Sequence, residues 1–247
     1  MKTLIGAALV AALAGVASAD ISTETAQFGG YININLATGQ TTYSDSNFST
    51  RATTIYSNTA SAASFGVSST DLNSTWGDDF TGVGSGGTLS GQQFTVFNSG
   101  TSLGSLLTAT VTMSYYDSVG AFLGGFNGNV NFGTGLNVGF YSVVTFSGLE
   151  SLGINLTSSN LIVTQKVASK TGLASRLGIV SMNPVNVGFS DIDMYVSSST
   201  IGGGVAGWYT FGTSGPANMG LQVDVIPAPA SVALLGMGGL VAARRRR

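Results

Sequence analysis

The chain of 247 residues contains no cysteine and no histidine, and only 8% of its residues are charged. Without cysteine no disulfide can stabilise the protein, so its stability has to come from a buried core. The same two absences exclude the usual nucleophile–base pairs of hydrolases, the usual zinc ligands and the commonest general base. A glycosidase needs only two facing carboxyl groups, but the only glutamates are Glu24 and Glu150. We therefore expect a protein that is not an enzyme.

Charge is distributed unevenly along the chain. All eleven acidic residues but only four of the nine basic residues lie between residues 20 and 225, which gives this segment a net charge of −7. Phosphate recognition needs clustered lysine or arginine, so we expect no nucleic-acid partner. The segment is long enough for one buried core, and nothing in its composition marks a boundary inside it. We therefore expect a single domain over residues 20–225.

The N-terminus has the three parts of a secretory signal peptide. Lys2 supplies the positive start, residues 4–16 are apolar, and Ala17 and Ala19 form a small-residue cleavage site before Asp20. This pattern predicts that a signal peptidase removes residues 1–19. The alternative is an uncleaved helical anchor, but the apolar stretch is short against the roughly 20 residues that a membrane span needs.

The C-terminus combines a short proline motif, an apolar segment and a basic cluster. The apolar segment covers residues 232–243 and predicts one transmembrane helix. From Ile226 to Ala243 such a helix reaches roughly 27 Å, enough for a thin bilayer. The arginines would remain in the cytoplasm, so the domain would lie outside it. The motif consists of Pro227, Ala228, Pro229, Ala230 and Ser231, and the basic cluster consists of Arg244, Arg245, Arg246 and Arg247.

These C-terminal residues resemble the PEP-CTERM family of bacterial sorting signals. Ala228 stands where the motif that names the family has glutamate, and the Pro-Ala-Pro-Ala-Ser form is similar to a variant found in planctomycete members. The resemblance covers residues 226–247. It implies processing by an exosortase-like membrane protease, and delivery to the cell envelope or to an extracellular polysaccharide matrix. A plain C-terminal membrane anchor, without a sorting enzyme, is the alternative.

The domain itself is predicted to be all-β. Glycine, serine, threonine and asparagine dominate, and the clearest alternation of apolar and polar residues covers residues 108–115. Glycine-rich segments at 81–87 and 124–128 are expected to be turns. We predict a single β-sandwich or jelly roll, followed by the C-terminal transmembrane helix. A β-solenoid is the alternative, because Asn137-Val-Gly-Phe140 recurs at 186–189. Further strands are expected at 32–36, 94–96, 140–146, 161–164, 191–196 and 221–226.

Oxygen-bearing side chains suggest a calcium site, although no metal ligand can be assigned. A turn-like stretch contains Asp71, Asn73, Asp78 and Asp79, but it lacks the spacing of an EF-hand loop. A second pair, Asp191 and Asp193, would lie about 7 Å apart on the polar face of one strand. The alternative is that both groups are solvated residues that keep turns and sheet edges soluble.

Three aromatic residues suggest contact with sugar rings. Trp76, Trp208 and Tyr209 could form a stacking platform, or they could be buried in the core. The sequence thus indicates an exported protein of structural or adhesive type at the cell surface or in the polysaccharide matrix. The second interpretation is a carbohydrate- or calcium-binding β-sandwich module.

Overall fold

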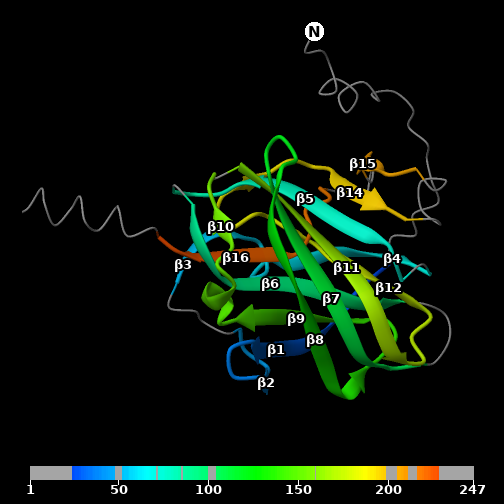
Figure 1. Ribbon diagram of the computed structural model, residues 1–247. Helices are drawn as coiled ribbons and strands as arrows, with labels where there is room; N and C mark the ends of the chain where they lie inside the picture. The colour runs from blue at the N-terminus through cyan, green and yellow to red at the C-terminus, as the bar shows by residue number, and fades with distance from the viewer. Residues whose placement is uncertain are drawn as a thin grey trace, which may run out of the picture.

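The computed structural model describes residues 24–47, 52–70, 72–84, 86–99, 104–158, 160–198, 205–210 and 216–227. These residues form two β-sheets and one short 3-10 turn, η1 (Leu149–Leu152). The two sheets pack face to face, and β7, β8 and β11 cross steeply in front of β6, β9 and β1 (Figure 1). The expected all-β, two-sheet fold is confirmed.

Sheet A has nine strands, six of which follow the order β2-β1-β9-β6-β12-β4. Three further strands join it, because β16 pairs with both β6 and β3, and β10 pairs with β6. Strands β1 and β9 are parallel, whereas the other pairs are antiparallel. The strand bounds are Gln27–Asn35 (β1), Gln40–Ser44 (β2), Thr53–Ser57 (β3), Ala62–Ser69 (β4), Gly87–Ser99 (β6), Phe140–Ser147 (β9), Asn155–Leu156 (β10), Arg176–Asn183 (β12) and Leu221–Ile226 (β16).

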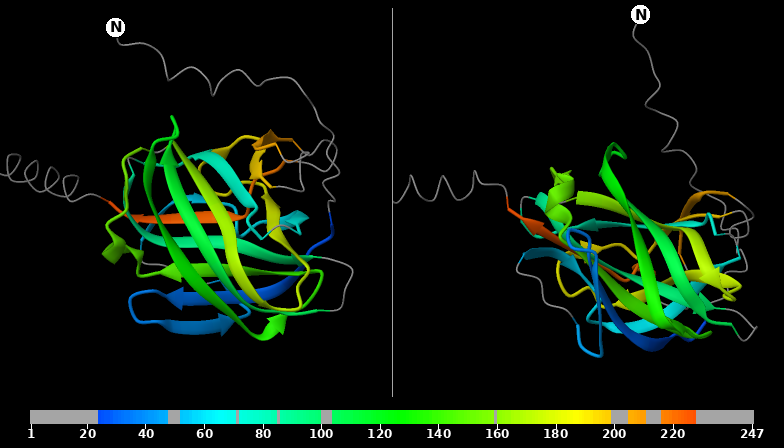
Figure 2. Two further views of the ribbon diagram at one scale, coloured as in Figure 1. Left: turned by 45° about the vertical axis from the view of Figure 1, so that its right-hand side comes forward. Right: turned by 60° about the horizontal axis from the view of Figure 1, so that its bottom comes forward.

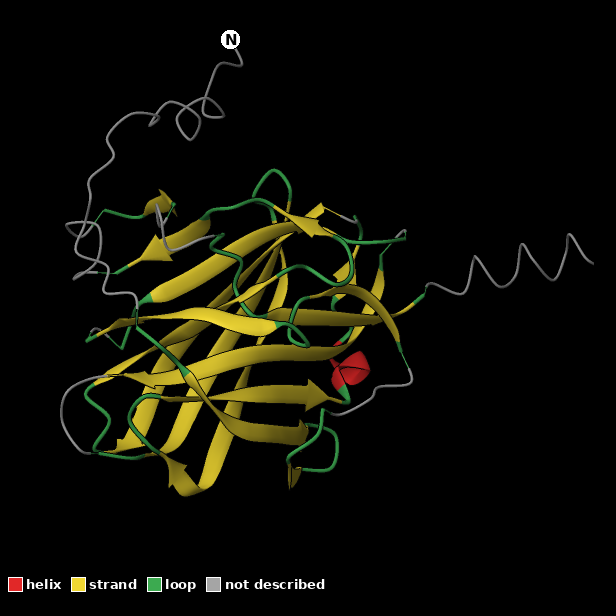
Figure 3. Cartoon of the chain, turned by 180° about the vertical axis from the view of Figure 1, so that it is seen from behind, coloured by secondary structure: helices red, strands yellow, loops and turns green. Residues whose placement is uncertain are grey.

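Sheet B has seven strands in the order β15-β14-β5-β11-β7-β8, with β13 also paired to β5. Figure 2 shows its long strands covering one side of sheet A, and Figure 3 shows the same two layers from behind. Chain-distant strands are neighbours in both sheets, which excludes the solenoid alternative. The bounds are Thr75–Thr81 (β5), Leu106–Asp117 (β7), Phe122–Leu136 (β8), Asn160–Gly172 (β11), Phe189–Ser190 (β13), Met194–Ser197 (β14) and Gly207–Tyr209 (β15).

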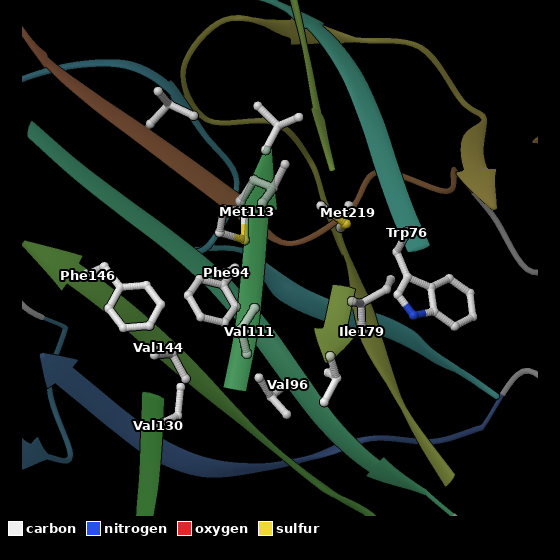
Figure 4. Packing of buried hydrophobic residues seen from close by; sticks show 14 of the residues in the cluster. Trp76, Phe94, Val96, Val111, Met113, Val130, Val144, Phe146, Ile179 and Met219 are labelled. Atoms are coloured by element: carbon white, nitrogen blue, oxygen red, sulfur yellow. The ribbon is translucent and has the colours of Figure 1, made fainter. Parts of the chain in front are cut away.

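The main core lies between the sheets. On β7 the residues Ala109, Val111, Met113 and Tyr115 are buried and the intervening polar residues are half-buried, as the alternation at 108–115 predicts. Phe94 and Val144 of sheet A are among the side chains in the same cluster (Figure 4). Burial of this continuous apolar layer is the main force that holds the two sheets together.

One predicted turn and one predicted strand differ from the structure. Residues 124–128 are not a turn but part of β8, where glycine leaves room for a ring from the facing sheet: a Cβ at Gly128 would lie 2.1 Å from Cζ of Phe146. The strand expected at 191–196 begins only at Met194, so Asp191 and Asp193 precede it. The glycines at 124–128 thus indicate close packing between the sheets. The alternation at 191–196 predicted a strand that begins too early.

Most of the targeting residues lie outside the described residues. These are residues 1–19 with Ala17 and Ala19, the motif residues Ala228, Pro229, Ala230 and Ser231, the apolar stretch 232–243, and Arg244 to Arg247. Pro227 is described and is exposed directly after β16. Within the described part of the chain, no helix has both the length and the apolar character needed to cross a membrane.

Candidate functional site

Four carboxyl groups gather at one place on sheet B. Asp78 and Asp79 lie on β5, and Asp191 and Asp193 lie in the segment that joins β13 to β14. Both β13 and β14 pair with β5, so the joining segment passes alongside the two β5 aspartates. Because adjacent strand residues point to opposite faces, Asp78 points into the core and Asp79 points outward.

Asp78 is completely buried and its carboxyl group has two hydrogen-bond partners. Ser190 Oγ lies 2.9 Å from Oδ1 of Asp78, and the backbone N–H of Met219 donates to Oδ2 at 2.7 Å. Ser190 Oγ also lies 2.9 Å from the backbone oxygen of Asp79. A protonated Asp78 can donate to Ser190 while Ser190 donates to Asp79, so the neutral acid satisfies every group in this chain of contacts.

The electrostatics of the site favour protonated carboxyl groups. Burial, with smaller contributions from Asp79 and Asp193, raises the pKa of Asp78 well above its usual range. Burial and the charge of Asp191 raise the pKa of Asp79, and burial together with Asp79 and Asp191 raises that of Asp193. Burial and the charge of Asp78 also raise the pKa of the Tyr56 hydroxyl. Asp78, Asp79 and Asp193 therefore hold their protons to a higher pH than isolated aspartates do.

We predict that Asp78→Asn removes a pH-dependent loss of stability. A raised folded-state pKa means that the folded protein binds the proton more tightly than the unfolded chain, so stability should fall as the pH rises above about 4, by up to about 1.4 kcal/mol per pH unit. An asparagine at 78 has nearly the same shape as the neutral acid and can place an N–H donor toward Ser190 and its carbonyl oxygen toward the Met219 N–H. Urea unfolding between pH 4 and 8 should therefore show a flatter profile for Asp78→Asn than for the parent protein.

A matched control for this experiment is Asp224→Asn. Asp224 is also completely buried, but its carboxylate accepts hydrogen bonds from Thr54 Oγ1 at 2.7 Å and from Gln222 Nε2 at 3.1 Å. An amide there turns one acceptor into a donor that faces donors, so Asp224→Asn should destabilise the protein at pH 7 by about 1–3 kcal/mol. A parent-like pH profile for Asp78→Asn would show that Asp78 is ionised in the folded protein.

A hollow of about 190 Å³ opens on the outer side of this cluster. Asp79, Ser190 and Asp191 line it together with the apolar side chains of Ile162 and Phe189. Oδ1 of Asp79 is buried, and no hydrogen-bond partner for it lies among the described residues. A buried carboxyl oxygen without a hydrogen-bond donor disfavours the charged form, which agrees in direction with the raised pKa of Asp79.

The calcium predictions do not agree with this geometry. The stretch ending at Asp78 and Asp79 is not a turn-like loop, because both aspartates lie on β5 and face opposite sides. Asn73 is exposed in the turn before β5, and Asp71 is outside the described residues. Asp191 and Asp193 do not share a strand face. Over the residues that the structure describes, no three His, Cys, Asp or Glu side chains form a group that could hold a metal ion.

The predicted aromatic platform is also wrong as a set of three. Trp76 is only 2% exposed and belongs to the core. Trp208 is 41% exposed and packs edge to face against Tyr195, with ring centroids 5.7 Å apart. Tyr209 packs against the core. Only Trp208 of the original three, together with Tyr195, therefore offers an exposed aromatic surface.

The two glutamates lie near opposite ends of β6. Glu24 accepts a hydrogen bond from Ser99, the last residue of β6. Glu150 lies on η1, which begins two residues after Ser147, the residue of β9 that pairs with Gly91 of β6. Strand geometry over this part of β6 separates them by about 25–30 Å. This distance is far greater than the roughly 5–10 Å between the carboxyl groups of a glycosidase.

Sequence reasoning missed the partners of Asp78. Ser190 and Met219 lie 112 and 141 residues away from it in the chain, and no spacing pattern connects them. Comparisons with protein-family models, with curated proteins and with solved structures find no match to this chain. The functional interpretation therefore rests on the residues themselves.

Proposed function

We propose that this chain is an exported, non-enzymatic protein of structural or adhesive type in the cell envelope or the extracellular polysaccharide matrix. In this proposal the domain is a jelly-roll-like sandwich followed by one transmembrane helix at 232–243. The observation that carries it is the order of the C-terminal residues: the motif at 227–231, the apolar stretch, and the arginines at 244–247. An exosortase-like protease would act on this signal after a signal peptidase has removed residues 1–19.

The attachment of the last strand supports a tethered role. β16 is hydrogen-bonded on both sides, to β6 and to β3, and its residues Val223 and Val225 are buried. It ends at Ile226, which is 47% exposed and directly precedes the motif. A pull on the anchor would therefore load two ladders of hydrogen bonds together. This arrangement suits a domain that is held at a surface by its C-terminus.

The proposal is tested by treating intact cells that produce the full chain with an added protease. We expect digestion of the domain in intact cells, because the arginines stay in the cytoplasm and the domain lies outside. A variant without residues 1–19 should remain protected until the cells are broken. Equal protection of both chains in intact cells would contradict export.

A carbohydrate-binding role is the second candidate, and one structural feature favours it over calcium binding. At one edge of sheet B, the outer face exposes Trp208 beside Tyr195. Toward the opposite edge, the same face is polar along the long strands β7 and β8. Aromatic faces and fixed polar groups are the two kinds of contact that sugars use.

A further inference from the structure

Three asparagine side chains form a row along the outer face of β8. Asn127, Asn129 and Asn131 are all exposed and alternate with the buried residues Gly128 and Val130. Successive members of the row are about 6.8 Å apart, since each lies two residues along an antiparallel strand. The row therefore presents the same chemical group at a regular spacing.

The oxygen of each of these amides already accepts one hydrogen bond. Thr112 Oγ1 donates to Oδ1 of Asn127 at 2.6 Å, and Thr110 Oγ1 donates to Oδ1 of Asn129 at 2.8 Å. The backbone N–H of Gly133, which can only donate, lies 2.9 Å from Oδ1 of Asn131. No described residue accepts a hydrogen bond from the three amide nitrogens. Each nitrogen thus has two N–H donors free for a ligand.

The neighbouring strands hold this row in place. Ser169 on β11 donates to Thr110 on β7 at 2.9 Å, which in turn donates to Asn129 on β8. Farther along, the hydroxyls of Thr108 and Thr171 lie 2.7 Å apart. Hydrogen bonds across three strands fix the side-chain rotamers before any ligand binds, so less conformational entropy is lost on binding.

The charge of this face restricts the partner. Its outward residues on β7, β8 and β11 include no acid and a single base, Lys166. One base in a domain of net charge −7 does not favour a polyanion. A second copy of the chain would place amide donors against amide donors. The face is best matched by an uncharged ligand that is rich in acceptors and repeats along its length.

We propose that the face formed by β7, β8 and β11 binds a neutral polysaccharide through the amide N–H groups of Asn127, Asn129 and Asn131. The hydroxyl and ring oxygens of the sugar units would accept these hydrogen bonds, and the hydroxyls of Thr108 and Thr171 would bond sugar hydroxyls beside them. This inference deepens the proposed function, on which it rests, by naming the ligand class and the binding face.

The test is a triple variant, Asn127→Asp, Asn129→Asp and Asn131→Asp, of the full chain in mild detergent. Aspartate retains the oxygen that accepts from Thr110, Thr112 or Gly133 and replaces only the outward donors. Native electrophoresis through gels containing dextran, galactomannan or hydroxyethyl cellulose reports binding as retardation. We expect at least one of these polymers to retard the parent chain. The triple variant should bind that polymer at least about tenfold more weakly.

The matched control carries the same three-charge change elsewhere. Asn137, Asn155 and Asn186 are also exposed and each accepts a hydroxyl hydrogen bond, from Ser105, Thr88 and Ser61, at 2.8–2.9 Å. Their triple aspartate variant should bind within about twofold of the parent chain, since it leaves the β8 row intact.

Three results would overturn the inference: equal weakening in both triple variants, no retardation of the parent chain by any neutral polymer, or retardation by alginate alone, which would make the ligand an anion. None of them would affect the protease test of export, because the β8 row lies far from both targeting segments in the sequence. If the domain is not exported, the protease test shows this whether or not the β8 row binds a polysaccharide.

Discussion

Trp76→Ala should lower the free energy of unfolding by about 3–5 kcal/mol. Trp76 lies on β5, pairs with Gln165 of β11 and Val196 of β14, and is 2% exposed. Its indole ring belongs to the buried cluster that includes Ile179 and Met219 (Figure 4). Alanine would leave a cavity that three paired strands cannot close. Urea denaturation followed by far-ultraviolet circular dichroism measures the loss.

The matched control is Trp208→Ala, which removes the same side chain from an exposed position. Trp208 contacts Tyr195 but is 41% exposed, so the expected cost is at most about 1 kcal/mol. A difference of several kcal/mol between the two variants follows from their burial. Similar losses for both tryptophans would contradict the burial of Trp76 between β5 and its neighbouring strands.

Gly128→Ala should destabilise the protein by up to about 3 kcal/mol, although alanine is usually preferred to glycine within a strand. The added Cβ would lie 2.1 Å from the ring of Phe146. That ring cannot move away easily, because Phe94 and Phe126 pack against it with centroids 5.3 and 5.4 Å away. The same denaturation measurement gives the effect.

A double-mutant cycle isolates the cause of that loss. Phe146→Leu removes the ring, so the variant carrying both changes should be more stable than the sum of the two single losses predicts, by about 0.5–3 kcal/mol. Gly207→Ala is the control, since the nearest atom to its added Cβ is 3.8 Å away. Strict additivity of the two changes would show that the ring is not the obstacle.

The strands that sequence reasoning found best are those with one buried face. β7 alternates cleanly because sheet B covers the core on one side only, so each residue's polarity matches its environment. β6 is harder to read, since Gln92, Gln93 and Thr95 are all completely buried in the middle of sheet A. Their polar groups are paired by contacts such as the 2.8 Å hydrogen bond from the Tyr115 hydroxyl to Gln92 Oε1, which no local pattern reveals.

The errors have a common physical origin in contacts between distant parts of the chain. Glycine at 128 indicates a turn from local preference, whereas the reason for it is Phe146 in the other sheet. Asp78 in a polar stretch indicates a solvated loop, whereas Ser190 and Met219 bury it. The row at 127, 129 and 131 is an alternating pattern in the sequence, but its free donors become visible only when the partners of each amide oxygen are known.

We propose that both ends of the chain direct its export, so that the folded domain works outside the cytoplasm. The most direct measurement is the N-terminal sequence of the protein recovered from the envelope fraction of cells that produce the full chain. We expect a chain that begins at Asp20. An intact chain that begins at Met1 and is found only in the cytosol would contradict it.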